Sequence, residues 1–382
     1  MLFFDSVNGK PSSFVPAAWV AALLLAGCAA PRPAAPLPPR AAGFVGLEDF
    51  TRFTRQAGTN PGEMVLLSPP IPAPVAWNEL IVSWNTAPGD HLTVEARSLG
   101  PNGPTRFYTL GQWADDPARH PRGSVARQAD ADGAVRTDTL ALQHPGGSVQ
   151  LRLTLGAEAG RSPHLKFVGL SFADRRTPPL PFAGNPAARG RVLPVPELRQ
   201  GDYPEEKGWC SPTSLAMVLA YWGNQLHRPD LRLPVPTVAQ AVYDPVFDGT
   251  GNWPFNTAFA GEFPGLRAYV TRMDDLAELE DWIALGVPPI LSVSSYLTNN
   301  RQVGRDNGHL IVCAGFTTNG DFIANDPGVS VRRNESPRRV YPRDRLLAAW
   351  RKSGRAVYLV YPESLVPPRP RAALAPLPNP PP

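Results

Sequence analysis

Residues 208–223, Gly-Trp-Cys-Ser-Pro-Thr-Ser-Leu-Ala-Met-Val-Leu-Ala-Tyr-Trp-Gly, decide the fold of the second half of this chain. Their apolar side chains recur at helical spacing, Pro212 suits a first helical turn, and Gly223 can close the helix in a left-handed cap. Cys210 is therefore predicted at a helix N-terminus, where unpaired backbone N–H groups and the helix dipole favour a thiolate over a thiol. Such a cysteine is suited to act as a nucleophile, although it can also be a small buried hydrophobic residue.

The segments that follow supply the groups that a nucleophilic thiol requires. Residues 307–316, Asn-Gly-His-Leu-Ile-Val-Cys-Ala-Gly-Phe, predict a strand that begins beside His309, and an Asn-Gly turn at 319–320 leads into Asp326. A thiol needs an imidazole within hydrogen-bond reach, and the imidazole needs a carboxylate or amide that fixes its tautomer. We therefore expect Cys210, His309 and Asp326 to converge.

Each of these partners has a competitor. His227 precedes Arg-Pro in a loop, where a solvated surface histidine is the ordinary outcome, so His309 is the favoured base. Asn325 could orient the imidazole in place of Asp326, with the acid preferred. Cys313 lies on the apolar strand after His309 and is expected to be buried and inert.

Three short motifs resemble a known group of papain-like enzymes: Trp-Cys-Ser-Pro-Thr-Ser at 209–214, Gly-His at 308–309, and Asn-Asp-Pro at 325–327. They are similar to the peptidase-like domains related to the bacteriocin-processing, double-glycine-leader peptidases, and the resemblance covers residues 192–363. It implies that Cys210 is the nucleophile, His309 the general base and Asp326 the residue that orients the imidazole. The residues considered by themselves indicate the same roles.

The sequence departs from this group at the oxyanion hole. Papain-like enzymes generally place a glutamine about six residues before the nucleophile, where its side chain and the cysteine N–H bind the developing oxyanion. Pro204 occupies that position here, and Gln200 lies slightly further upstream. Gln200 can complete the hole if the residues between it and Cys210 loop out; without it the hole is incomplete.

A glycine-rich, aromatic stretch lies between the nucleophile and the base, with the sequence Gly-Thr-Gly-Asn-Trp-Pro-Phe-Asn at 249–256. Loops of this composition often line clefts, so we expect Trp253 or Asn256 near the substrate, together with Trp209 beside the nucleophile. The alternative is a loop that is packed for its own stability.

The pattern of residues 192–363 predicts an α+β fold in which the Cys210 helix packs on an antiparallel sheet. An irregular stretch is expected at 229–236 and a loop-rich segment at 244–264. One helix is expected to begin at Asp274 or Asp275 and to end before Gly286, and another lies near 342–352. Strands are predicted at 289–294, 310–316, 321–325 and 356–361.

Residues 42–174 predict an all-β sandwich, jelly-roll-like, because short strands with period-two alternation are separated by turn signals. The strands are expected at 80–84, 92–96, 149–155 and 165–170, and residues 175–191 form an inter-domain linker. The architecture resembles carbohydrate-binding modules, which suggests glycan contact if Trp77, Tyr108 or Trp113 stacks on sugar rings. The favoured interpretation is that these aromatics are core or edge residues.

Composition and the N-terminal segment restrict the partners and the compartment. The net charge is only +4 and the arginines are scattered, which disfavours nucleic acid as a partner. Cysteines at 28, 210 and 313 lack metal-type spacing, so no metal or other cofactor is expected. An apolar run at 14–26 ends in Leu-Ala-Gly-Cys, with Cys28 last, and resembles the lipobox of bacterial lipoproteins.

The lipobox resemblance implies a signal peptide at 1–27 and a lipid on Cys28 that holds the protein to the bacterial cell envelope, facing the periplasm or on the outer membrane. A proline-rich linker at 28–41 and a proline-rich tail at 364–382 flank the two domains. An uncleaved leader or anchor is the alternative at the N-terminus, and both interpretations predict export.

Together these features predict an exported, lipid-anchored cysteine hydrolase that cleaves an amide bond in a peptide or a cell-wall cross-link. Acyl transfer to an amine is an equivalent possibility within the enzyme class. The rival from another class is an envelope binding protein whose papain-like domain is catalytically silent and whose sandwich supplies the affinity. Processing of a bacteriocin leader is disfavoured because no transporter segments accompany the domain.

Overall fold

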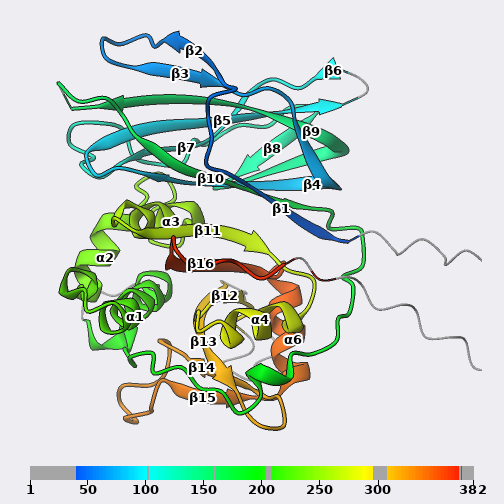
Figure 1. Cartoon of the computed structure of the whole chain (residues 1–382), viewed down its shortest axis with the longest axis vertical. Helices are drawn as coiled ribbons and strands as arrows, with labels where there is room; N and C mark the ends of the chain where they lie inside the picture. The colour runs from blue at the N-terminus through cyan, green and yellow to red at the C-terminus, as the bar shows by residue number, and fades with distance from the viewer. Residues whose placement is uncertain are drawn as a thin grey trace, which may run out of the picture. The chain divides into compact units, whose positions relative to one another are not determined.

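The computed structural model describes residues 40–100, 103–158, 160–203, 208–295, 308–369 and 371. These residues belong to one compact unit and form two antiparallel sheets with helices packed on the second (Figure 1), which confirms the predicted α+β class. The predicted signal peptide, the Cys28 lipidation site, and most of the proline-rich linker and tail lie outside the described residues. Among the described residues, no helix has both the length and the apolar character needed to cross a membrane.

The first sheet contains ten strands and folds back on itself into two layers. Its strands are β1 (Ala42–Leu47), β2 (Thr54–Ala57), β3 (Met64–Leu67), β4 (Ile71–Thr86), β5 (Asp90–Gly100), β6 (Gly103–Pro104), β7 (Tyr108–Ala114), β8 (Gly133–Arg136), β9 (Thr139–Ala157) and β10 (Leu165–Ala173). The first part of the long strand β9 pairs with β4 and β8, whereas its last part pairs with β3 and β5. The long strand β9 therefore belongs to both layers of the sandwich.

The aromatic residues of the sandwich lie in its core. Trp77, Tyr108 and Trp113 have exposed fractions of 0%, 0% and 1%. Trp77 packs edge-on against Phe172 of β10, and the Trp113 indole N–H donates to Glu262 at 2.9 Å. None of these three rings has a face available to stack on a sugar, so the core interpretation holds and the glycan-stacking alternative is wrong for them.

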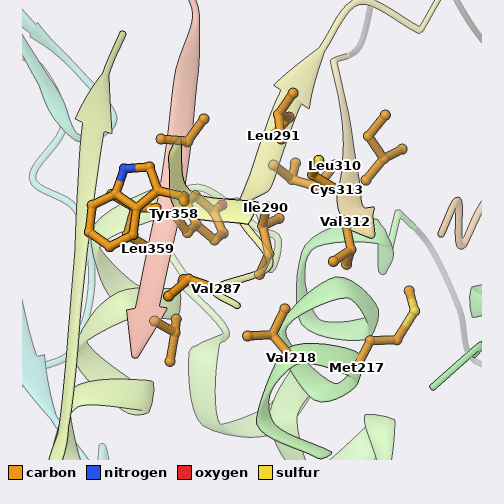
Figure 2. Close-up of a cluster of buried hydrophobic side chains, with 14 of the residues drawn as sticks. Met217, Val218, Val287, Ile290, Leu291, Leu310, Val312, Cys313, Tyr358 and Leu359 are labelled. Atoms are coloured by element: carbon orange, nitrogen blue, oxygen red, sulfur yellow. The ribbon is translucent and has the colours of Figure 1, made fainter. Parts of the chain in front are cut away.

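The second sheet has six strands in the order β11-β16-β12-β13-β14-β15. Its strands are β11 (Leu266–Arg272), β12 (Ile290–Val293), β13 (His309–Phe316), β14 (Phe322–Asn325), β15 (Arg338–Tyr341) and β16 (Ala356–Pro362). The helices are α1 (Cys210–Gln225), α2 (Val235–Val242), α3 (Trp253–Glu262), α4 (Leu276–Ala284) and α6 (Arg343–Lys352), with short 3-10 turns η1 (Pro186–Ala188), η2 (Gln200–Asp202) and η3 (Pro229–Leu231). Figure 2 shows Met217 and Val218 of α1 in one buried cluster with Ile290 and Val312 of the sheet. The nucleophile helix thus packs on an antiparallel sheet, as predicted.

Helix α1 extends two residues beyond Gly223, so the predicted glycine cap is wrong. Gly223 lies inside the helix, where a Cβ would approach the Arg228 carbonyl oxygen to 2.9 Å. The left-handed residue is instead His227, with φ of 54°. Gly223 is required because the chain folds closely back over the end of the helix, and no left-handed conformation is involved.

The segments predicted to be irregular contain two helices. Helix α3 begins after Asn252, whose side-chain oxygen accepts the Phe255 N–H, and Pro254 occupies its first turn. Both are ordinary helix-start signals. The glycines at 249 and 251 indicated a loop, and that loop ends immediately before the helix. Helix α2 likewise begins in the stretch around Pro236 that was expected to be irregular.

The sandwich covers the outer edge of β11, the terminal strand of the second sheet. Asn85 of β4 accepts the Ala268 N–H at 3.1 Å and donates to the Ala268 carbonyl at 2.8 Å. Ser83 accepts the Val270 N–H at 2.9 Å, and Ser171 of β10 accepts the Arg272 N–H at 3.1 Å. Unpaired edge groups would otherwise be buried at high cost, so these side chains complete the β11 hydrogen bonds. The sandwich is therefore a fixed part of the second sheet's edge.

We expect Asn85→Ala to destabilise the protein by about 1–3 kcal/mol for each buried backbone group that it leaves unpaired. Urea unfolding followed by tryptophan fluorescence measures the change. Gln56→Ala, on the exposed strand β2, is the matched control and should lie within about 0.5 kcal/mol of the parent. Equal stabilities of the two variants would contradict the role assigned to Asn85.

Candidate active site

Cys210 is the first residue of α1 and is half-exposed. Two serines of the same helical turn tie it to the sheet: the Ser211 and Tyr358 hydroxyls hydrogen-bond at 2.9 Å, and the Ser214 hydroxyl donates to the Leu310 carbonyl at 3.2 Å. Leu310 directly follows His309. The Ser-Pro-Thr-Ser motif therefore fixes the helix tip against the beginning of β13.

His309 and Asp326 come together because β13 and β14 form an antiparallel pair. Val312 lies opposite Asn325 in the register, so the start of β13 and the end of β14 share one edge of the sheet. The His309 Nε2 and Asp326 Oδ1 atoms are 2.7 Å apart, and both residues are buried. The hairpin predicted from the Asn-Gly turn brings these two side chains together.

The electrostatics of the site favour a protonated imidazole. Burial by itself would lower the pKa of His309, but the charge of the Asp326 carboxylate and its hydrogen bond to the ring, with a smaller effect of Cys210, outweigh it and raise this pKa to about 10. Burial acts to raise the pKa of Asp326, yet the charge of His309 and three hydrogen bonds hold it below its ordinary value. At neutral pH the pair is therefore an imidazolium and a carboxylate.

Two residues that support Asp326 were not predicted from the sequence. The Tyr341 hydroxyl on β15 donates to Asp326 Oδ2 at 2.7 Å, and the Gly328 N–H donates to Oδ1 at 2.8 Å. A Cβ at position 328 would lie 2.8 Å from the His309 ring, so only glycine fits there. The Asp-Pro-Gly triplet at 326–328 could have suggested Gly328, whereas the contact of Tyr341 depends on the pairing of β15 with β14.

The competing residues have other roles. His227 is exposed at the far end of the 16-residue helix α1, about 24 Å from its tip at 1.5 Å per residue. Asn325 is fully buried, donates to the Val195 and Pro196 carbonyls and accepts from Arg338. Cys313 is buried, and burial raises the pKa of its thiol well above the ordinary value. Neither His227 nor Asn325 can therefore complete the Cys210 site.

A cavity of about 570 Å³ opens at Cys210 and is lined by Cys210, by the neighbours of His309 at 308 and 310, and by Trp253. Trp253 is therefore placed where a substrate would bind. Trp209 lines an adjoining cavity of about 900 Å³, which shares Thr250 with the first. The substrate role of both tryptophans stays a prediction.

The structure contradicts the prediction that Asn256 contacts substrate. Asn256 is fully buried inside α3, and its amide nitrogen donates to the Thr250 and Asn252 carbonyls at 2.9 and 2.8 Å. The side chain therefore holds the loop that precedes the helix, which was the alternative interpretation for this segment.

Gln200 begins the 3-10 turn η2 and lies beside the loop that carries the acid. Its backbone N–H donates to the Pro327 carbonyl at 3.0 Å, and its side chain is half-buried. Gln200 is not among the residues that line the cavity at Cys210. Residues 204–207, which connect it to the nucleophile, lie outside the described part of the chain, so its role in the oxyanion hole stays a prediction.

Comparisons with known proteins match both halves of the chain to peptidase families. Residues 62–173 match the Peptidase C39 N-terminal domain, and residues 192–358 match the Peptidase_C39 like family. A crystal structure described as that of a C39-like peptidase from Bacillus anthracis is 20% identical, with a TM-score of 0.34, over 44% of this chain and 96% of that chain. No curated protein matches the chain.

The helix-borne cysteine on an antiparallel sheet defines a papain-like cysteine peptidase domain. Residues 192–358 match the model of the C39-like peptidase family, which confirms the resemblance found in the sequence. The chain is thus a cysteine peptidase-like hydrolase with a C39-type N-terminal domain ahead of it.

The raised pKa of His309 predicts that stability falls as the pH rises. The folded protein keeps the His309 proton up to a pH of about 10, whereas an unfolded histidine loses it near 6.5. The stabilisation is therefore complete below about pH 6.5 and is lost between there and pH 10. Urea unfolding across this range should give a flatter profile for His309→Gln than for the parent, while His227→Gln should keep the parent profile. Parallel profiles for all three proteins would refute the assignment.

Tyr341→Phe removes one hydrogen bond to the Asp326 carboxylate. We expect a loss of about 1.5–3 kcal/mol in the free energy of unfolding at neutral pH, because hydrogen bonds to charged groups are worth that much. The loss should shrink in acid as Asp326 becomes protonated. Tyr203→Phe, at a half-buried position, is the control and should change stability by less than about 0.5 kcal/mol. A pH-independent loss would show that only packing is affected.

Proposed function

We propose that Cys210, His309 and Asp326 are the catalytic triad of a hydrolase that cleaves an amide bond through an acyl-thioenzyme. The observation that carries this proposal is the 2.7 Å contact between His309 and Asp326, together with the position of Cys210 at the tip of α1, which Ser214 ties to the residue after His309. In this proposal His309 takes the thiol proton, so that the Cys210 sulfur attacks as a thiolate and the imidazolium beside Asp326 keeps the proton for the leaving group.

The proposed reaction has two steps. The Cys210 sulfur attacks the amide carbonyl carbon, and the resulting oxyanion accepts hydrogen bonds from the Cys210 backbone N–H and from Gln200. His309 then donates its proton to the leaving amine, and the C–N bond breaks to leave a thioester. Water gives a proton to His309 as it attacks the thioester, which releases the acid and regenerates the thiolate–imidazolium pair. Asp326 keeps the imidazole oriented throughout.

The substrate we propose is a peptide or a cell-wall cross-link, bound along the cavity that Trp253 lines and towards Trp209. Acyl transfer would follow if an amine took the place of water. We also propose that the protein is exported and held at the cell envelope by a lipid on Cys28, a proposal supported by the Leu-Ala-Gly-Cys box. The alternative of a silent binding domain is disfavoured because all three side chains are present and the buried pair is hydrogen-bonded.

Alkylation of Cys210 tests the triad without knowledge of the substrate. Iodoacetamide should label Cys210 rapidly and about 10²-fold faster than an ordinary thiol at pH 6, since the thiolate is the reactive species. His309→Ala should abolish the advantage, whereas His227→Ala should retain it. Quantitative mass spectrometry of the peptide that contains Cys210 gives the rates and separates it from Cys28. Labelling at the rate of an ordinary exposed thiol would leave the silent binding domain as the better account.

A further inference from the structure

The sandwich domain forms one wall of the cavity at Cys210. The turn between β8 and β9 contributes Arg136, Thr137, Asp138 and Thr139 to the lining of that cavity. The second domain contributes other lining residues, including Trp253. Any substrate that occupies this cavity therefore contacts a domain that carries no member of the triad.

The turn that reaches the cavity is held in an uncommon backbone conformation. Thr137 has φ of 58°, and the Asp138 N–H donates to the Arg136 carbonyl at 2.8 Å, which closes a three-residue turn around Thr137. A β-branched residue in the left-handed region is a genuine outlier, and such strain concentrates at ligand sites. The conformation makes the chain reverse at the cavity wall.

Asp138 fixes this turn to the peptidase domain. Its carboxylate is buried, accepts the Trp253 N–H at 3.0 Å and accepts the Thr139 hydroxyl at 2.9 Å. Trp253 is the first residue of α3, where a carboxylate satisfies an otherwise unpaired N–H. The position of Arg136 relative to the second domain is therefore set by a buried contact and not by a free hairpin.

Among the described residues that line the cavity, Arg136 is the unpaired cation. Arg272, the other arginine in the lining, forms an ion pair with Glu79 at 2.7 Å. Each remaining acid of the lining also has a donor, since Asp138 is bonded as described and Asp248 accepts the Tyr243 hydroxyl at 2.6 Å. Arg136 is exposed, and within the described residues its guanidinium has no hydrogen bond or ion pair.

We propose that Arg136 is a substrate-binding residue of the hydrolase and that it binds a carboxylate of the substrate, so that the sandwich domain selects acidic peptides. The guanidinium has five N–H donors in a planar arrangement that matches a carboxylate. This proposal rests on the proposed function, because the cavity is that of the Cys210 nucleophile. Phe247, an exposed aromatic residue that lines the same cavity, offers an apolar surface beside the cation.

The experiment compares two alkylating agents on the same thiol. Iodoacetate carries a carboxylate and iodoacetamide does not, and the ratio of their rates at Cys210 reports the charge that the reagent meets in the cavity. We expect Arg136→Ala to lower the iodoacetate-to-iodoacetamide ratio about two- to fivefold, as for other exposed charge pairs, and Arg136→Glu to lower it further. Arg136→Lys should keep most of the ratio. Arg55→Ala, at an exposed arginine of β2, removes the same charge away from the cavity and should leave the ratio unchanged.

The outcomes separate this proposal from that of the triad. A ratio that is the same in the parent, Arg136→Ala and Arg136→Glu would overturn the role of Arg136, even if Cys210 reacts rapidly. Slow labelling of Cys210 by both reagents would overturn the proposed triad but not the role of Arg136. The ratio compares two reagents on one thiol, so it still reports whether Arg136 attracts the carboxylate of iodoacetate. A fall in the ratio that also occurs in Arg55→Ala would show a general charge effect and would refute a specific site.

Discussion

The buried pair of His309 and Asp326 is the interaction on which the rest of the second domain depends. Burying two charges costs several kcal/mol per ion unless further hydrogen bonds satisfy them. Here the carboxylate also receives the Tyr341 hydroxyl and the Gly328 N–H, so strand β15 and the loop after β14 are required to keep it charged. The pair in turn keeps the imidazole protonated next to Cys210. The position of β15 in the sheet and the conformation of the loop after β14 therefore both help to keep His309 protonated.

The contacts between the two domains change the interpretation of the sandwich. The sequence predicted a separate sandwich domain that is joined to the second domain by a linker. In the structure its side chains complete the hydrogen bonds of β11, and its β8–β9 turn lines the cavity at the nucleophile. A module with these contacts cannot be removed without exposing the edge of the peptidase sheet. The sandwich is therefore a structural part of the hydrolase.

The sequence predicted the features that depend on local pattern. The Cys210 helix, the β13–β14 hairpin and the buried Cys313 follow from periodicity and from an Asn-Gly turn, and the hairpin was sufficient to bring His309 and Asp326 together. The features that were missed depend on contacts distant in the chain. Tyr341 reaches Asp326 only because β15 pairs with β14, and the Trp253 N–H at the start of α3 is bound by Asp138, more than a hundred residues earlier. Neither contact can be inferred from the residues that lie next to it in the sequence.

Asp138 shows how a distant residue can set the geometry of a site. Its carboxylate is buried, and this burial raises its pKa to about 6. The same carboxylate accepts the N–H of Trp253, the first residue of α3. Trp253 consequently faces the cavity from a helix whose start is fixed by another domain. The glycine-rich stretch before it indicated a cleft correctly, but its aromatic residue is held by the sandwich and not by the loop. Residues of both domains therefore line the cavity. The groups that a substrate meets there cannot be inferred from the papain-like domain alone.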